Sequence, residues 1–356
     1  MSILEAFVGL LIAASISLAT AQQGNYPSDT VQTAEGVDLQ LPPTAFGGGI
    51  EGAAVNARGD VFAVDYRAAG AGPGKAFGFF SETEGGTKSV LDLAANPIFN
   101  ASTEGVANPP LISGARFLKD GRILIADANN SRVLSVKDAR PSTFCANGAM
   151  LQPNDLALSV NIPEMIYLSG QNYTATTVAG QHGALWTCAG STAIQFPPAL
   201  LAQADVHRTN GIETSPCGKY LYLSSATNVA GNVTANRIYR FTIDTPTGNL
   251  VGQIPSLFHE FTGADAAIDI DGMRTDVNGN LYVTRNGQGK IVKLSPAGQP
   301  LMTINLPGMG GPSNLEFGGA EGKTLFAVGP CKANATIGCA AKFEGETVGK
   351  AFSLLQ

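Results

Sequence analysis

The sequence predicts an all-β protein, a six-bladed β-propeller, on three observations. A strand–turn–strand unit recurs along the chain, and successive units begin 63, 40, 56, 61 and about 42 residues apart. No segment shows an amphipathic period of helix length. The chain contains 43 Gly and 20 Pro among 356 residues, without a G-X-Y period, as a turn-rich fold requires. Units of this length with up to four short strands are typical of propeller blades. A pair of β-sandwiches is the alternative, but the even spacing favours the ring.

Each unit begins with a short inner run, continues through a Gly-containing turn and ends in strongly β-forming residues. The residues that start the six inner runs are Glu51, Gly114, Asn154, Asn210, Asp271 and Ser313-Asn314. The β-forming runs that follow are 61–66, 122–127 with 132–136, 165–170, 220–225 with 237–243, 280–284 with 290–295, and 324–329. The Asn278-Gly279 pair predicts a hairpin with a type I′ turn. Two insertions rich in Gly, Thr and Asn, 172–183 and 228–236, predict surface loops.

Three segments are expected along the chain. Residues 1–21 predict a cleaved secretory signal, because the apolar run 7–18 precedes Ala-Thr-Ala and is too short to span a membrane. A signal anchor is the alternative, since Glu5 is acidic and no Lys or Arg precedes the run. Residues 22–45 are expected to form an N-terminal arm that closes the last blade. Residues 46–356 are then the propeller, as a single domain.

Composition and charge exclude several classes of protein. Only 14% of the residues are charged, which excludes a solvated disordered chain or a coiled coil. The formal net charge of −6 argues against nucleic-acid and polybasic membrane surfaces. We expect a secreted, extracellular monomer with a small-molecule partner and with neither nucleic acid nor membrane as a partner. Five Asn-x-Ser/Thr sequons support secretion and predict a glycosylated surface; they begin at Asn100, Asn129, Asn172, Asn232 and Asn334.

The five cysteines fit an oxidising compartment better than a metal site. None lies in a CxxC motif or has His at zinc spacing, so a thiolate zinc site is not expected. Cys331 could pair with Cys339 across a hairpin, and Cys145 could pair with Cys188. Cys217 is then left over in a turn, either as an odd turn residue or as a catalytic thiol.

Hard oxygen donors start four of the inner runs. They are Glu51, Asn154, Asn210 and Asp271. Because the innermost strands of a propeller line one channel, equivalent residues of different blades converge near its axis. Two carboxylates and two amide oxygens suit Ca²⁺ or Mg²⁺, and could take Mn²⁺ or Zn²⁺. The alternative is structural, since Asn and Asp are favoured in turns.

Five ordered motifs resemble the SMP-30/gluconolactonase/luciferin-regenerating-enzyme family, over about residues 45 to 330. The run 210–222 is similar to the family's NGxxxSPDGxxLY element, and 271–284 to its DGMxxDxxGNLYV element. The segments 51–52, 153–156 and 312–319 match three further elements in order.

This resemblance implies a six-bladed propeller that hydrolyses lactones with one divalent cation, Ca²⁺ before Zn²⁺, Mg²⁺ or Mn²⁺. It implies metal ligation by Glu51, Asn210 and Asp271. It also implies that Asn154 touches the substrate or completes the metal shell, with Asp155 beside it.

Residue chemistry fits the implied activity. A cation that polarises the carbonyl and activates water could suffice for an ester already strained by its ring. Asp271, or the nearby Asp269 or Asp155, could accept the proton from water, so Asp271 and Asn154 are the catalytic candidates. No G-x-S-x-G is present, which argues against a serine esterase. Among the histidines, which are more often surface residues, His207 could reach the channel mouth.

Three departures from the family pattern bear on the substrate. Ala53 stands where an aromatic residue usually follows Glu-Gly, Gln152 where sugar-lactone members often carry Arg, and Ile270 where Pro is usual. The loss of a fixed cation at Gln152, a candidate substrate-binding residue, weakens the case for a sugar-acid lactone and favours an uncharged or more apolar one. Two other functions stay open: a non-hydrolytic isomerase or cyclase of secondary metabolism, and an extracellular binding module with a structural metal.

Overall fold

The structure is a computed structural model that describes residues 31–43, 45–66, 78–82, 88–90, 110–138 and 140–356. The expected signal segment 1–21, the first part of the arm and the Asn100 sequon lie outside the described residues. Residues 31–356 form one compact unit, which is described below.

The described strands form six sheets, five of four strands and one of five. The first three sheets contain β3 (Ile50–Val55), β4 (Val61–Asp65), β5 (Gly78–Glu82) and β6 (Lys88–Val90); β7 (Ile112–Phe117), β8 (Ile123–Asp127), β9 (Arg132–Lys137) and β10 (Arg140–Ala146); and β11 (Gln152–Leu158), β12 (Met165–Gln171), β13 (Gly183–Ala189) and β14 (Thr192–Gln195). The other three contain β15 (Arg208–Thr214), β16 (Tyr220–Val229), β17 (Asn232–Thr242) and β18 (Ser256–Phe261); β19 (Asp269–Thr275), β20 (Leu281–Asn286), β21 (Lys290–Leu294), β22 (Pro300–Asn305) and β1 (Gln32–Glu35); and β23 (Asn314–Gly318), β24 (Thr324–Pro330), β25 (Gly338–Glu344) and β2 (Val37–Leu39).

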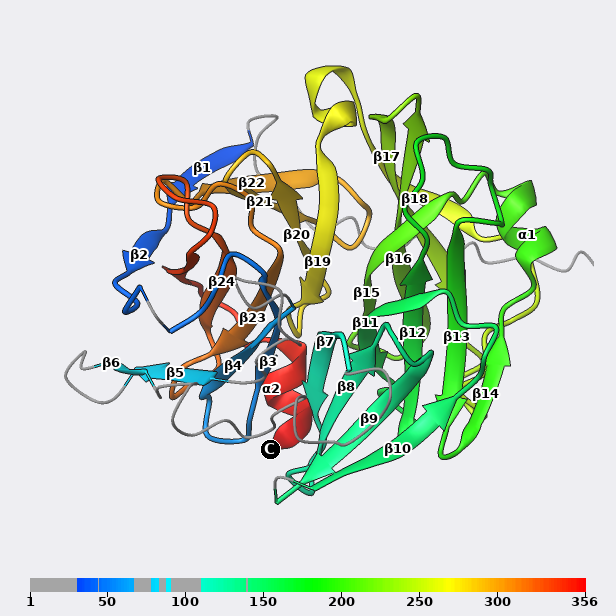
Figure 1. The fold of residues 1–356 in the computed structure, drawn as a ribbon, viewed down its shortest axis with the longest axis horizontal. Helices are drawn as coiled ribbons and strands as arrows, with labels where there is room; N and C mark the ends of the chain where they lie inside the picture. Colours follow the sequence, from blue (N-terminus) through cyan, green and yellow to red (C-terminus); the bar gives the residue numbers. More distant parts are fainter. Residues whose placement is uncertain (1–30, 44, 67–77, 83–87, 91–109, 139) are drawn as a thin grey trace, which may run out of the picture. The chain divides into compact units, whose positions relative to one another are not determined.

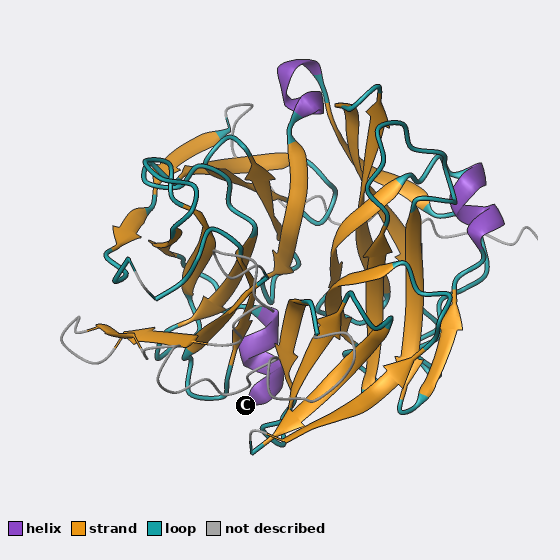
Figure 2. Ribbon diagram, in the orientation of Figure 1, coloured by secondary structure: helices purple, strands orange, loops and turns teal. Residues whose placement is uncertain are grey.

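Helices are few and short among the described residues. They are α1 (Pro198–Gln203), a 3-10 turn (Gly263–Ala267) and α2 (Lys350–Leu355), as Figure 2 shows. No helix in the described part of the chain is long and apolar enough to cross a membrane.

The first strand of each antiparallel meander packs against the first strand of the next. These inner-strand contacts run from β3 to β7, β11, β15, β19 and β23, and then from β23 back to β3. Figure 1 shows the sheets following one another in the colours of the chain. Side-chain hydrogen bonds also join neighbouring sheets: Ser313 Oγ donates to the carbonyl of Ile50 at 2.6 Å, and Thr275 Oγ1 donates to that of Thr214 at 2.9 Å. This cyclic order of inner strands is that of an all-β propeller and excludes the pair of sandwiches.

The arm supplies edge strands to two sheets. β2 pairs antiparallel with β25, in the sheet that holds the last inner strand, as expected from the sequence. β1 pairs in parallel with β22 of the neighbouring sheet, which the sequence did not predict. Segments far apart in sequence thus share two sheets, which supports ring closure.

Hydrophobic side chains fill the space between neighbouring sheets. Between the third and fourth sheets, Phe196 and Phe241 meet edge to face with their ring centroids 5.2 Å apart, within a cluster that includes Leu185 and Leu221. Successive side chains along a strand point to opposite faces of its sheet, and each face packs against a neighbouring sheet, so both faces are buried.

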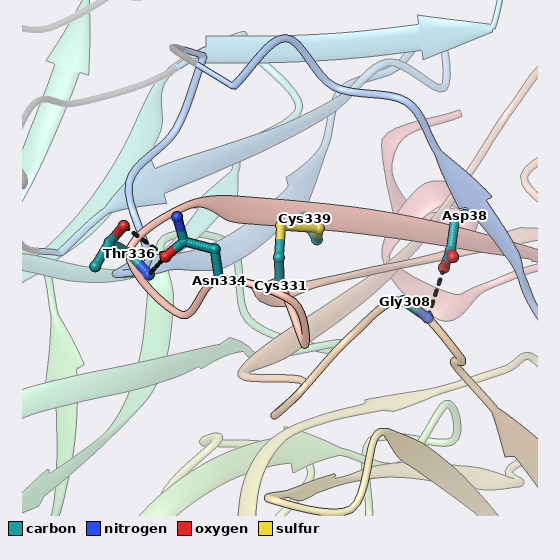
Figure 3. The surroundings of a disulfide bond; sticks show 6 residues. All are labelled: Asp38, Gly308, Cys331, Asn334, Thr336 and Cys339. Atoms are coloured by element: carbon teal, nitrogen blue, oxygen red, sulfur yellow. Dashed lines mark hydrogen bonds between the residues drawn. A yellow bond between two sulfur atoms is a disulfide. The ribbon is translucent and has the colours of Figure 1, made fainter.

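Two disulfides join the cysteines that the sequence analysis paired. Cys145 on β10 is bonded to Cys188 on β13, and this bond joins two sheets. Cys331 is bonded to Cys339 across the turn before β25 (Figure 3). Cys217 is free and exposed. Both pairings are therefore confirmed.

The hairpin expected at Asn278-Gly279 is confirmed, but the type I′ turn is wrong. Of these two residues only Gly279 has a positive φ, 84°, whereas a type I′ turn needs a positive φ at both. The Asp276 carboxylate accepts hydrogen bonds from the backbone N–H groups of Asn278 and Asn280 at 3.0 and 2.9 Å. These bonds stabilise a turn in which only the glycine takes the left-handed conformation.

Candidate functional site

Five inner strands share an irregularity at one level of the ring. The pairing register shifts within β7, β11, β15 and β19, and directly after Glu51 in β3. The pairs of residues inside the first four shifts are Ser113-Gly114, Asn154-Asp155, Asn210-Gly211 and Asp271-Gly272. A β-bulge re-aims side chains, and these bulges occur where the sequence places its oxygen donors.

Glycine beside the donor lets neighbouring inner strands approach closely. A Cβ on Gly211 would lie 2.0 Å from the carbonyl oxygen of Asp271, and one on Gly52 would lie 2.3 Å from that of Ser113. Both contacts are too short for any larger residue. The pair of a polar residue followed by Gly thus occurs where the backbones of neighbouring inner strands lie too close together for a side chain.

The four donors line one cavity. It has a volume of about 470 Å³, and its lining residues are Glu51, Tyr66, Leu111, Gln152, Asn154, Gln171, Asn172, Tyr173, Asn210 and Asp271. Glu51, Asn154, Asn210 and Asp271 come from four different strands, β3, β11, β15 and β19. No Lys, Arg or His is among the described residues that line it. The fold thus brings together the four oxygen donors that start the inner runs.

The two carboxylates of the cavity are costly to ionise without a cation. Burial raises the pKa of Glu51 well above its usual range, and the charges of Asp271 and Asp155 raise it further. Burial is also the main cause that raises the pKa of Asp271 to about 7, although Asn286 Nδ2 donates to its Oδ2 at 2.8 Å and opposes the shift. A positive charge between the two carboxylates would stabilise their ionised forms and lower both pKa values.

Two amide oxygens of the cavity lack a partner. The Oδ1 atoms of Asn154 and Asn210 are buried and accept no hydrogen bond from the described residues. Such atoms are rare in folded proteins because burial removes their water. Two carboxylates and two free amide oxygens are donors that a hard divalent cation prefers. The described residues contain no group of three His, Cys, Asp or Glu placed to hold a metal, so a cage here depends on the two amides.

Two other predicted site residues do not line the cavity. Asp155 is 1% exposed, and its two carboxylate oxygens lie 3.3 Å from Arg116 Nη1 and from Arg274 Nη1. His207 contacts Asp205 through Nε2 and Thr177 through Nδ1, each at 2.9 Å. Both side chains are engaged away from the cavity, so the structure does not bring them to the predicted substrate site. Gln152 does line it.

The sequence analysis missed part of the cavity wall. Gln171 and Asn172, at the end of β12 and the start of the following loop, line it together with Tyr173. The Arg208 guanidinium lies 4.6 Å from the centre of the Tyr173 ring and donates to Gln171 Oε1 at 3.2 Å, which fixes this wall. Ser113 lies in the bulge of β7 and precedes Gly114 as Glu51 precedes Gly52, but it is not among the residues that line the cavity. Its buried hydroxyl has no partner among the described residues.

Comparisons with known proteins agree with this architecture. A family model described as the SMP-30/gluconolactonase/LRE-like region matches residues 81–328. Regucalcin from Agrobacterium tumefaciens, a calcium-binding protein, is a similar solved structure, with 19% identity, a TM-score of 0.65, and 90% of this chain and 97% of that chain covered. A luciferin-regenerating enzyme is similar at 14% identity and a TM-score of 0.61, with 88% and 97% covered. A gluconolactonase from Xanthomonas campestris is similar at 17% identity and a TM-score of 0.57, with 89% and 98% covered. No curated protein matches the sequence significantly.

Proposed function

Because the chain belongs to the SMP-30/gluconolactonase/LRE-like family, we propose that it is a secreted, metal-dependent lactonase. The reaction would take place in the cavity between Glu51, Asn154, Asn210 and Asp271. We take each of the six sheets as one blade of the ring. The two disulfides support an extracellular location, since such bonds persist in oxidising compartments.

Charge balance along the inner strands supports a dication. Apart from Glu51 and Asp271, the inner strands and α2 carry four basic and four acidic side chains in contact with one another: Arg116, Arg208, Arg274 and Lys350, with Asp155, Asp269, Glu213 and Glu316. The two cavity carboxylates are therefore left without a basic partner on these elements. A divalent ion would neutralise both.

The proposed ligands of the ion are Glu51, Asn210 and Asp271, with Asn154 completing the shell or binding the substrate. The unpartnered Oδ1 atoms of the two asparagines are the single observation that carries this assignment. We propose Ca²⁺ first, because all four donors are oxygens, with Zn²⁺, Mg²⁺ and Mn²⁺ as alternatives. The similar regucalcin is itself described as a calcium-binding protein.

The chemistry follows from the residues of the cavity. When bound, the ion supplies Lewis acidity toward the lactone carbonyl and toward water. Asp271 accepts the proton of the attacking water, because its carboxylate lies in the same cavity as the other proposed ligands. Asn154 and Gln152 orient the ester through their amide groups. Asn286 holds the Asp271 carboxylate through its hydrogen bond at 2.8 Å.

The cavity wall favours an uncharged lactone. No basic side chain is among the described lining residues, so a substrate carboxylate would find no partner there. Amide groups from Gln152, Gln171 and Asn172 can bind hydroxyl or carbonyl groups, and Tyr66 and Tyr173 present aromatic surface. We therefore propose a neutral lactone that carries polar groups or an apolar ring.

Metal analysis combined with a lactone panel tests the proposal. The purified protein should hold about one divalent ion, lose turnover with a chelator and regain it with Ca²⁺, Zn²⁺ or Mn²⁺. The Asp271→Asn variant keeps the side-chain shape and should lose at least a hundredfold in kcat. Full activity in this variant would overturn the mechanism.

Two other results would replace the proposal. Turnover without incorporation of ¹⁸O from labelled water would favour the non-hydrolytic enzyme. Metal binding that raises Tm without turnover of any lactone would favour a binding module.

A further inference from the structure

Arg274 is a buried arginine on an inner strand that also carries a residue of the cavity. It lies on β19 three residues after Asp271 and is 1% exposed. Burial of a guanidinium is unfavourable unless charged partners and hydrogen bonds compensate for lost water. Asp155 and Glu316 supply two carboxylates, with Arg274 Nη1 at 3.3 Å from Asp155 Oδ2 and Nε at 3.0 Å from Glu316 Oε2.

The remaining donors of Arg274 reach backbone and amide oxygens. Nη2 donates to the carbonyl of Ala53 and to Asn314 Oδ1, each at 2.8 Å, and Nη1 donates to the carbonyl of Met273 at 2.6 Å. With the two carboxylate contacts, five acceptors surround a group that carries five N–H donors. Its hydrogen-bonding capacity is therefore fully used within the ring.

Four of these five acceptors lie on three other inner strands, two of which carry residues of the cavity. Ala53 is two residues after Glu51 on β3, and Asp155 directly follows Asn154 on β11. Asn314 and Glu316 lie on β23. One planar side chain therefore connects β3, β11 and β23 to β19, which carries Asp271. Among the described residues, the hydrogen bonds of the other two arginines of the inner strands, Arg116 and Arg208, reach only one further inner strand each.

We propose that Arg274 is the positioning residue of the cavity: its guanidinium sets the spacing between β3, β11 and β19, and thereby holds Glu51, Asn154 and Asp271 at the separation that a cation needs. This inference rests on the proposed metal site. It concerns geometry rather than charge alone, because lysine keeps the charge but has three donors on one atom and cannot reach acceptors on three strands.

Two variants and a control separate positioning from general stability. Arg274→Lys keeps the cation and loses the planar fork. Glu316→Gln keeps the side-chain shape and weakens one anchor of Arg274 on β23, a strand that carries none of the proposed ligands. Lys350→Met removes another buried cation. Among the described residues, the hydrogen bonds of the Lys350 ammonium go to Glu213 and Thr214 on β15, and none goes to β3, β11 or β23. All three should lower Tm, so a loss of stability alone does not distinguish them.

Binding of Tb³⁺, an oxygen-preferring probe of calcium sites, gives the first readout. Tyr66 and Tyr173 line the cavity and can sensitise its luminescence. We expect Arg274→Lys to weaken Tb³⁺ binding at least tenfold and to add bound water, measured from luminescence lifetimes in H₂O and D₂O. Glu316→Gln should weaken it about threefold, and Lys350→Met less than twofold. Equal affinities in Arg274→Lys and Lys350→Met would overturn the proposal. If Arg274→Lys does not fold, equal affinities in Glu316→Gln and Lys350→Met would overturn it.

Hydrogen exchange on the metal-free protein gives a readout that does not need an ion. Arg274→Lys should speed amide exchange in peptides from β3 and β11, whereas Lys350→Met should speed it in α2 and β15. If the wild-type protein binds no ion, the metal proposal is wrong. The exchange pattern of the metal-free protein still tests whether Arg274 positions β3 and β11. Unchanged exchange in β3 and β11 of the Arg274→Lys variant would contradict it.

Discussion

The raised pKa values of the cavity carboxylates predict that binding of the proposed cation depends on pH. Cation and proton compete for the same oxygens, so the ion binds only to the fraction of protein in which Asp271 is ionised. With the pKa of Asp271 raised to about 7, that fraction falls about thirtyfold between pH 8 and pH 5.5. The pKa of Glu51 is raised as well, which makes the fall steeper. We therefore expect the apparent affinity for Ca²⁺ to be at least about thirtyfold weaker at pH 5.5.

Calorimetric titration at pH 5.5, 7 and 8 measures this dependence. Repetition in two buffers of different ionisation enthalpy counts the protons released, and we expect at least about one per ion at pH 6, because both cavity carboxylates have raised pKa values. The matched variant Asn286→Ala removes the hydrogen bond that stabilises ionised Asp271 and so raises its pKa. Its affinity should drop about fivefold at pH 7 and change little at pH 9. An affinity that varied less than threefold from pH 8 to pH 5.5 would refute the reasoning.

Three further outcomes follow from other parts of the structure. In the metal-free protein, ionisation of Asp271 is favoured more in the unfolded chain than in the fold. The free energy of unfolding should therefore decrease by about 3 kcal/mol between pH 4 and pH 7 relative to Asp271→Asn. Parallel curves from chemical denaturation would contradict this. Replacing Cys145 and Cys188 by Ala opens a loop with a sequence separation of 43 and should lower the free energy of unfolding in urea by about 4 kcal/mol. Loss of the other disulfide, whose separation is 8, should lower it less. The reverse order would contradict the loop-entropy argument. Gly211→Ala places a Cβ 2.0 Å from a backbone oxygen and should destabilise the folded protein by about 3 kcal/mol. Gly252→Ala, with open space around it, should leave the stability unchanged. Equal Tm values for the two variants would contradict the close approach of the inner strands.

The ring and the residues at its centre could be predicted from sequence because their signals are local. A polar residue before glycine, followed by a short apolar run and a turn, marks four of the five bulges, and Glu51, Asn210 and Asp271 all carry this signal. The fifth bulge, Asn154-Asp155, has no glycine. Fold topology then places them together, since the first strands of successive units contact one another around the ring. Ser113 carries the same signal at the bulge of β7 but does not line the cavity, so the signal marks the bulge rather than the site.

The surroundings of these residues could not be predicted in the same way. Asp155 follows Asn154 directly, yet Arg116 and Arg274 from two other strands bind its carboxylate away from the cavity. The residues around Asp155 in sequence do not predict these two arginine partners, which are 39 and 119 residues away. The same holds for Tyr173, whose place at the cavity depends on contact with Arg208. Long-range ion pairs and loop packing decide such positions, and they have no local pattern.

The location of a bound ion tests the central claim most directly. A crystal structure of the protein soaked with Mn²⁺, with anomalous scattering used to place the ion, would show which side chains hold it. We predict one ion in the cavity with oxygens of Glu51, Asn210 and Asp271 at bonding distance, about 2.1–2.6 Å. An ion bound elsewhere, or a cavity that remains without an ion at saturating metal, would contradict the account.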